Sequence, residues 1–436
     1  MSSKMSVQGL LMFKFILISL LVLFSACSQK IVKPDEKAFA AEDQYIIFAL
    51  YAEQHGDYRN AVKLFQKLYK KSSKEEYLYR YLEDEIIIKK YDDVIATVDK
   101  ITEGSLKDSL LVRLKVIALL ESNKLQEAKK ISIELARYTG KAKDYLLVSD
   151  VYSKSKDYDL ALKYLDSAYM KNYNEKILDK MAVILYVNLH KKKEAIADLE
   201  THSRIHGCSK LICDRLISFY SHDNNINGLL SVYKRLYAKT KSEDIAQKIM
   251  QIYSYKRKYT KLIDFLEANP INNELLLDLY VSGKNYTKAS QLAFKLYKEE
   301  SDYSYLGQSA IYKYESYKGE IPKKALLNVI NNLEKVVQHN NSTLYKNYLG
   351  YILIDHDINV KKGMKYIRDV LKKQPDSAYY LDSLAWGYYK EGRCYKARKI
   401  MLKVMKDDAG NVPEVKEHFR KINSCIKTQR RVKKKK

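Results

Sequence analysis

The sequence has few of the residues that interrupt helices and none of the common catalytic motifs. Only 14 of its 436 residues are glycine and 5 are proline, which argues against a turn-rich all-β fold and against domains joined by flexible linkers. The prolines, which lie where predicted helices start or end, are Pro34, Pro270, Pro322, Pro375 and Pro413. No glycine-rich phosphate loop, Gly-x-Ser-x-Gly elbow or His-Glu-x-x-His helix is present, which excludes the sites that these motifs signal.

The overall composition says more about fold than about partners. Apolar residues make up 46% of the chain, which is enough to build a core and excludes a disordered chain. Lysine and arginine number 78 against 53 acidic residues, a net charge of +25. That excess favours anionic partners. Heavy use of lysine, tyrosine, isoleucine and asparagine is also typical of AT-rich genomes, so we discount the charge as a functional signal.

The N-terminus predicts an export signal. An apolar run covers residues 15–24 after Lys14, and Ser25-Ala26-Cys27-Ser28 follow it. The run is too short to span a bilayer as a mature helix but suits the hydrophobic region of a signal peptide. Small residues before a single cysteine resemble a bacterial lipobox, with Phe24 where leucine is usual.

The lipobox resemblance implies a lipoprotein signal peptide over residues 1–26 and a lipidated tether over residues 27–42. Cys27 would carry the diacylglycerol and palmitate chains. Ser28, in place of aspartate, implies sorting to the outer membrane, with the chain on its periplasmic face. The alternatives are an uncleaved N-terminal anchor or an ordinary signal peptide with an incidental cysteine.

The body of the chain repeats one unit. Tyr58-Arg-Asn-Ala61 recurs as Tyr158-Asp-Leu-Ala161, as Tyr286-Thr-Lys-Ala289 and as Cys394-Tyr-Lys-Ala397. Anchoring every unit on the first of these positions gives steps that are mostly 33 or 34 residues. The anchors are Tyr58, Tyr91, Leu125, Tyr158, Lys192, Ile226, Tyr259, Tyr286, Pro322, Asn359 and Cys394.

This pattern resembles the tetratricopeptide repeat (TPR). In the last unit Leu384-Ala385, Tyr388, Gly392 and Ala397 occupy the family's motif positions. The resemblance implies an all-α TPR superhelix of about eleven helix-turn-helix repeats over residues 43–408. A capping helix over residues 409–427 and a basic tail over residues 428–436 would follow. The small alanines would let the two helices of a repeat approach closely.

Four cysteines follow Cys27, and an oxidising periplasm would allow three pairings among them. Cys394 begins the second helix of the last predicted repeat and Cys425 ends the next, antiparallel helix, so we expect these two to pair. Cys208 and Cys213 would then pair across a helix start, and four buried thiols are the alternative. His202 and His206 have metal-like spacing beside these cysteines. We nevertheless predict no metal and no cofactor.

The first helices of the last three repeats supply the predicted binding groove, because that helix lines the concave face in TPR proteins. Tyr351 and Trp386 are the leading candidates, since both occupy the same position in adjacent repeats and such rings are enriched at binding hot spots. The alternative is that these aromatic side chains pack between neighbouring helices. The full predicted set is Tyr314, Tyr317, Lys318, Asn347, Tyr351, Tyr379, Asp382, Trp386, Tyr389 and Lys390.

The last two repeats also suggest a function. Residues 348–355 and 380–388 resemble the TPR lipoprotein adaptors of periplasmic carboxyl-terminal processing proteases. That resemblance implies a membrane-anchored scaffold that binds envelope proteins and recruits a protease or cell-wall hydrolase. The alternative is a structural or assembly factor of a pilus, secretion or outer-membrane assembly machine.

Two further classes of protein, an enzyme and a nucleic-acid-binding protein, are less compatible with the sequence. Helical scaffolds also carry lytic transglycosylase domains, but fewer than 30 residues follow residue 408, so we predict no enzyme activity. The basic tail favours contact with lipid, peptidoglycan or an acidic protein face rather than with nucleic acid. The sequence predicts no particular oligomeric state.

Overall fold

The computed structural model describes residues 37–317 and 320–435. The predicted signal peptide, Cys27, Lys318 and most of the tether lie outside these residues. Within them the chain is all-α: helices follow one another and no strand occurs. None of the described helices is both long and apolar enough to cross a membrane.

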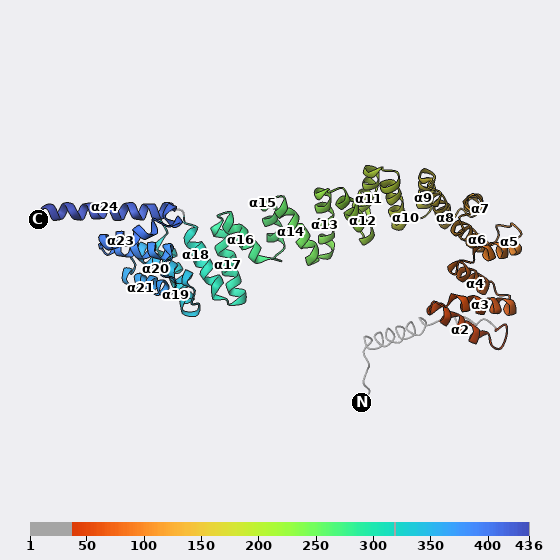
Figure 1. Ribbon diagram of the computed structural model, residues 1–436, viewed down its shortest axis with the longest axis horizontal. Coiled ribbons are helices and arrows are strands. Elements are labelled where there is room, and N and C mark those ends of the chain that lie inside the picture. Colours follow the sequence, from red (N-terminus) through yellow and green to blue (C-terminus); the bar gives the residue numbers. More distant parts are fainter. Residues whose placement is uncertain (1–36, 318–319, 436) are drawn as a thin grey trace, which may run out of the picture. The chain divides into compact units, whose positions relative to one another are not determined.

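In the described part of the chain the helices form eleven antiparallel hairpins followed by one longer helix (Figure 1). The first helices of the hairpins are α2 (Glu42–Gln54), α4 (Glu75–Ile87), α6 (Ser109–Glu121), α8 (Ala142–Lys154), α10 (Glu175–Val183), α12 (Lys210–His222), α14 (Glu243–Tyr255), α16 (Asn273–Ser282), α18 (Tyr303–Glu315), α20 (Thr343–Asp355) and α22 (Ala378–Lys390). The second helices are α3 (Tyr58–Ser72), α5 (Tyr91–Thr102), α7 (Leu125–Thr139), α9 (Tyr158–Lys171), α11 (Lys192–His206), α13 (Ile226–Thr240), α15 (Tyr259–Ala268), α17 (Tyr286–Glu300), α19 (Lys323–His339), α21 (Val360–Lys373) and α23 (Cys394–Val404). A π-helical turn, η1 (Ile184–Asn188), extends α10, and a 3₁₀ turn, η2 (Asp408–Asn411), precedes α24 (Pro413–Lys435).

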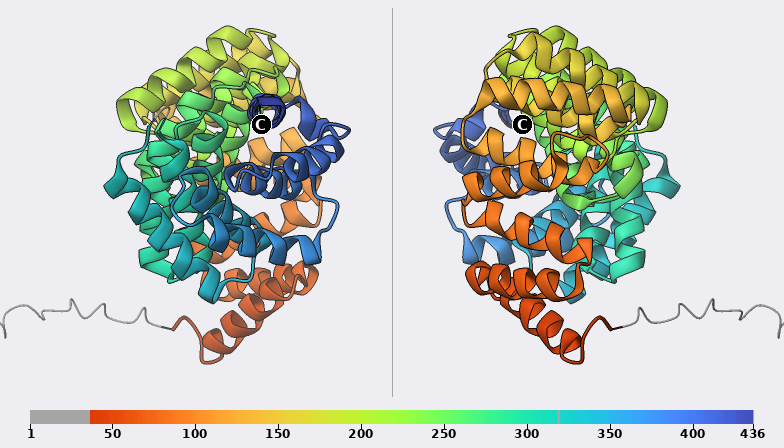
Figure 2. Two further views of the ribbon diagram at one scale, coloured as in Figure 1. Left: turned by 90° about the vertical axis from the view of Figure 1, so that its left-hand side faces the viewer. Right: turned by 90° about the vertical axis from the view of Figure 1, so that its right-hand side faces the viewer.

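The array divides into two compact units, the first ending at Val232 and the second beginning at Tyr233, within α13. Within each unit consecutive hairpins stack in the order of the sequence. The gradual change of colour in Figure 2 reflects this order. Each hairpin therefore buries its apolar faces mainly against its neighbours in the sequence, as expected for a helical repeat.

The predicted repeat anchors coincide with the starts of the second helices. All eleven anchors lie at the first residue of a second helix or one residue before it. In ten hairpins a left-handed residue stands two or three positions before that start. It reverses the chain, and only Gly56 and Gly392 among the ten are glycine. The fold class predicted from the repeat pattern is confirmed.

Small residues explain how the two helices of a hairpin come together. Ala61, Ala161 and Ala397, each the fourth residue of its second helix, are fully buried. The equivalent residue of α21 is Gly363, where an added Cβ would lie 2.5 Å from the backbone oxygen of Gly350. The backbones of α20 and α21 therefore approach more closely than an alanine would allow.

The irregular later steps have a local cause. Helices α15 and α16 have only 10 residues each, whereas α19 has 17. Shorter helices bring the next anchor closer in the sequence and longer ones move it away.

The predicted boundary between capping helix and tail is wrong. Helix α24 is continuous from Pro413 to Lys435, so residues 428–435 are part of the helix rather than a separate tail. The segment contains no proline or glycine to end the helix.

Candidate functional site

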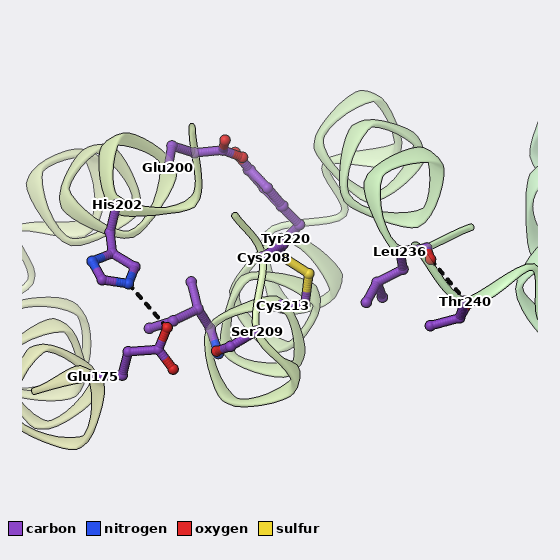
Figure 3. The surroundings of a disulfide bond; sticks show 10 residues. Glu175, Glu200, His202, Cys208, Ser209, Cys213, Tyr220, Leu236 and Thr240 are labelled. Carbon is purple, nitrogen blue, oxygen red and sulfur yellow. Dashed lines mark hydrogen bonds and ion pairs between the residues drawn. A yellow bond between two sulfur atoms is a disulfide. The ribbon is translucent and has the colours of Figure 1, made fainter. Parts of the chain in front are cut away.

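The first cluster of predicted site residues lies between α11 and α12 (Figure 3). A disulfide joins Cys208 and Cys213 across the start of α12. His202 Nε2 lies 3.1 Å from a carboxylate oxygen of Glu175, and its ring lies beside that of His206. The disulfide leaves neither sulfur as a thiolate ligand. No group of three metal-ligating side chains is found among the described residues.

The second cluster lies where α24 covers α22. The Trp386 side chain is only 3% exposed, and its ring stacks on that of His418 with 4.0 Å between centroids. Its indole nitrogen donates to Asp355 Oδ1 at 2.8 Å. His418 Nδ1 in turn lies 3.0 and 3.1 Å from the two carboxylate oxygens of Asp382. The two contacts of His418 hold α24 against the last hairpin, and the indole hydrogen bond ties α22 to α20.

A second disulfide fixes the same helix further along. Cys394, the first residue of α23, is bonded to Cys425 of α24, and the Cα atoms are 6.1 Å apart. The two helices also share an apolar core that includes Ala397, Met401 and Ile422. Helix α24 is thus tied to α23 by a covalent bond and to α22 by a buried polar cluster.

Beside this cap lies a tyrosine-rich pocket with a volume of about 620 Å³. Its walls come from α18, α20 and α22, and its far side comes from the start of α24. Five of the predicted groove residues line it: Tyr314, Asn347, Tyr351, Tyr379 and Asp382. The other lining residues are Glu315, Leu344, Tyr348, Gln374, Ser377, Tyr380, Ser383, Val412, Glu414 and Val415. The volume falls within the usual range of roughly 300–1,000 Å³ for ligand pockets.

The charged side chains that line this C-terminal pocket are all acidic: Glu315, Asp382 and Glu414. The hydroxyl of Tyr351 donates to Glu414 Oε1, and burial, followed by the charge of Glu414, raises the pKa of that tyrosine. Burial also raises the pKa of Tyr348 to about 12, with further contributions from Glu315 and Glu414. The pKa of Glu315 is itself raised, first by burial and then by Glu414. Glu315 and Glu414 therefore lie close enough for their charges to interact.

Four described residues of the predicted groove do not line the pocket. Trp386 is buried under α24, and Tyr389 stacks on its ring at 4.6 Å. Lys390 reaches back to the α20–α21 turn, where its Nζ donates to the backbone oxygen of Asp355 at 2.6 Å. Tyr317 lies two residues beyond the end of α18, under the Lys313 ammonium. The preference for Trp386 as a groove residue is thus wrong for this structure, because α24 covers that face.

Sequence reasoning missed Glu315 and Tyr348, which neighbour predicted residues on the same helices, and Glu414, which lies on the cap. Repeat spacing does not predict where helix α24 lies, so nothing in the sequence identifies Glu414 as a pocket residue. Glu315 and Tyr348 could have been found by taking adjacent residues along each first helix.

Comparisons with known proteins add little to this geometry. A scan against models of protein families finds no match, and no curated protein matches either. Among solved structures, the chain is similar to the anaphase-promoting complex hetero-tetramer Cut9–Hcn1, with 10% identity, a TM-score of 0.38, and coverage of 88% of this chain and 97% of that one.

Two further solved structures are similar to the chain. MamA from Desulfovibrio magneticus RS-1 has 13% identity and a TM-score of 0.33, covering 39% of this chain and 97% of its own. The TPR domain of P58(IPK) has 14% identity and a TM-score of 0.23, covering 89% and 99%. All three TM-scores lie below 0.5, so the fold assignment rests on the helical hairpins themselves.

Proposed function

We propose that this chain is a scaffold that binds other proteins, and that the C-terminal pocket is its main docking site. The observation that carries the proposal is the pocket itself. Three consecutive first helices and the cap helix converge on a tyrosine-rich cavity of about 620 Å³. Tyrosine supplies a large, rigid and amphipathic contact surface at low entropic cost, which suits protein recognition.

The finer parts of the proposal rest on the sequence. The lipobox-like residues around Cys27 support a lipid anchor on the periplasmic face of the outer membrane. The amino-acid sequence of the last two repeats supports recruitment of a periplasmic protease or cell-wall hydrolase. Replacing Cys27 by alanine should move the protein out of the membrane fraction, and retention there would count against the anchor.

The pocket assignment is tested with variants that leave the core intact. Leu344 and Tyr379 line the pocket but are 48% and 64% exposed, so a Leu344→Ala/Tyr379→Ala variant should fold normally. The matched control is Leu402→Ala/Tyr255→Ala, which removes two similarly exposed side chains of the same unit that lie outside the pocket. Crosslinked partners are captured from cells that carry each variant and are quantified by mass spectrometry.

We expect the pocket variant to lose at least about fivefold of its partner signal, since one hot-spot side chain contributes about 1 kcal/mol or more. The control should retain it. Equal capture by both variants would place the docking site elsewhere. Recovery of a protease or hydrolase supports the adaptor role, whereas recovery of pilus, secretion or outer-membrane assembly components supports the assembly role.

A further inference from the structure

The charge of the C-terminal pocket is opposite to that of the chain. The protein carries a net charge of +25, yet the residues that line the pocket include three carboxylates and no lysine, arginine or histidine. Asp382 is already hydrogen-bonded to His418. Glu315 and Glu414 have no basic partner among the described residues. A basic segment would be repelled by most of this molecule and attracted to these two groups.

The pocket offers hydrogen-bond acceptors to a ligand, beside the hydroxyl donors of Tyr348 and Tyr379 and the amide donor of Gln374. The Oδ1 atom of Asn347 is buried and has no hydrogen-bond partner in the described part of the chain. The hydroxyl protons of Tyr351 and Tyr380 are already directed to Glu414 and to Thr343. A ligand that brought further acceptors or negative charge would leave these groups unpaired, at a cost in binding free energy. Ammonium and guanidinium groups carry only donors, so they fit this set.

The aromatic walls favour the same groups. Lysine and arginine side chains of this chain lie over several of its own rings, as Lys396 lies 4.5 Å from the centre of Tyr388. None of the intramolecular contacts of this kind found among residues 37–317 and 320–435 uses the ring of Tyr348, Tyr351 or Tyr379. Tyr379 is 64% exposed, and Tyr348 and Tyr351 are partly exposed at the pocket, so an external cation can reach these rings. The adjacent Leu344 and Val412 can pack against the aliphatic stem of a long side chain.

The chain's own basic C-terminus cannot fill the pocket of the same molecule. Glu414 stands in the first turn of α24, and the helix runs for 23 residues from Pro413. At about 1.5 Å per residue it carries its last lysines roughly 30 Å away from that turn. The lysines at the end of α24 are therefore excluded as occupants of the pocket in the same molecule.

We propose that the C-terminal pocket recognises a lysine or arginine side chain on an extended segment of a partner protein, with the cation held by Glu315 and Glu414 against the tyrosine rings. This inference rests on the proposed function and specifies the chemistry of the partner. Other occupants, including an acidic peptide or the tail of a second copy, are outcomes of the test below.

The test uses a phage-displayed library of random 12-residue peptides and the detergent-solubilised full-length protein. Peptides are selected on the wild-type protein after depletion on the Leu344→Ala/Tyr379→Ala variant, which removes sequences that bind outside the pocket. Dissociation constants of synthetic copies are then measured for wild type, for Glu315→Gln/Glu414→Gln and for Glu417→Gln. The last variant is a matched control because Glu417 lies on the same helix and pairs with Arg420 instead.

We expect the selected peptides to be enriched in lysine or arginine and to bind Glu315→Gln/Glu414→Gln about tenfold more weakly, with little change for Glu417→Gln. Glutamine keeps the acceptor for the Tyr351 hydroxyl, so the variant should fold. Pocket-dependent peptides without basic enrichment would overturn the inference and leave the proposed function standing. Selection of sequences matching residues 427–436 would point to a second copy and contradict a different partner. Failure to recover any pocket-dependent peptide would overturn both.

Discussion

Two adjacent carboxylic acids of the first unit make its stability depend on pH. Asp84 and Glu85 of α4 are 2% and 3% exposed, and Asp84 Oδ2 and Glu85 Oε2 have no hydrogen-bond partner among the described residues. Burial, and then the charge of Glu53, raises the pKa of Asp84 to about 7. Burial, and then the charge of Asp93, raises the pKa of Glu85 to about 7. In both cases folding disfavours the ionised form.

The sign and size of the effect follow from these values. A folded pKa above the unfolded one means that the native state holds a proton which the unfolded state releases, so stability falls as pH rises from about 4 to about 7. Each pKa unit corresponds to about 1.4 kcal/mol. The shift of Asp84 from 3.8 to about 7 therefore costs at most about 4 kcal/mol above pH 7, and that of Glu85 from 4.5 to about 7 costs at most about 3 kcal/mol.

Replacing Asp84 by asparagine, or Glu85 by glutamine, should remove most of this cost. We expect each variant to gain about 1–3 kcal/mol in the free energy of unfolding at pH 8 and less than about 1 kcal/mol at pH 4. Urea-dependent hydrogen exchange of peptides covering α4 measures that local free energy. Glu83→Gln is the control, since its carboxylate is exposed on the same helix. A gain that is equal at both pH values, or a loss at pH 8, would refute the reasoning.

Three further predictions concern the second unit. Because Trp386 is the single tryptophan and is buried under α24, its fluorescence should have the short-wavelength maximum of a buried indole, and a solvent-like maximum in the native protein would contradict the docking of α24. Replacing Cys394 and Cys425 by alanine opens a loop with a sequence separation of 31 and should destabilise the docking of α24 by about 3–4 kcal/mol in the chain-entropy treatment. Hydrogen exchange in α24 should become faster, and unchanged exchange would mean that the other contacts hold the helix. Gly363→Ala should lower the free energy of unfolding by about 1–3 kcal/mol, measured by urea denaturation, because the new methyl group meets the Gly350 carbonyl; a stabilised variant would show that α20 and α21 are less closely packed.

Much of the fold could be predicted because each repeat is determined by local sequence. The anchors at Tyr58 through Cys394 coincide with the starts of the second helices. The small residues four positions into a helix, such as Ala61, mark close contact between the two helices of a hairpin. These features depend on residues a few tens of positions apart, so a period of 33 or 34 residues is enough to reveal them.

The binding site was harder to predict because the cap is not part of the repeat. Glu414 and Tyr351 are hydrogen-bonded although they are 63 positions apart in the sequence. The repeat period does not predict this contact. The same helix buries Trp386, which repeat position alone assigns to an open face. Five of the predicted groove residues do line the pocket, since those positions depend only on which side of a first helix they occupy.

The central claim, that the C-terminal pocket is where this scaffold docks its protein partners, is tested most directly by photo-crosslinking in living cells. A benzophenone amino acid is placed at Tyr379, on the pocket rim, and in a separate strain at Tyr255, which is 76% exposed on α14 and does not line the pocket. We expect a discrete protein adduct from position 379 and none from position 255. The Glu315→Gln/Glu414→Gln variant should weaken the adduct from position 379. The same adduct from both positions, or an adduct from position 255 alone, would contradict the central claim.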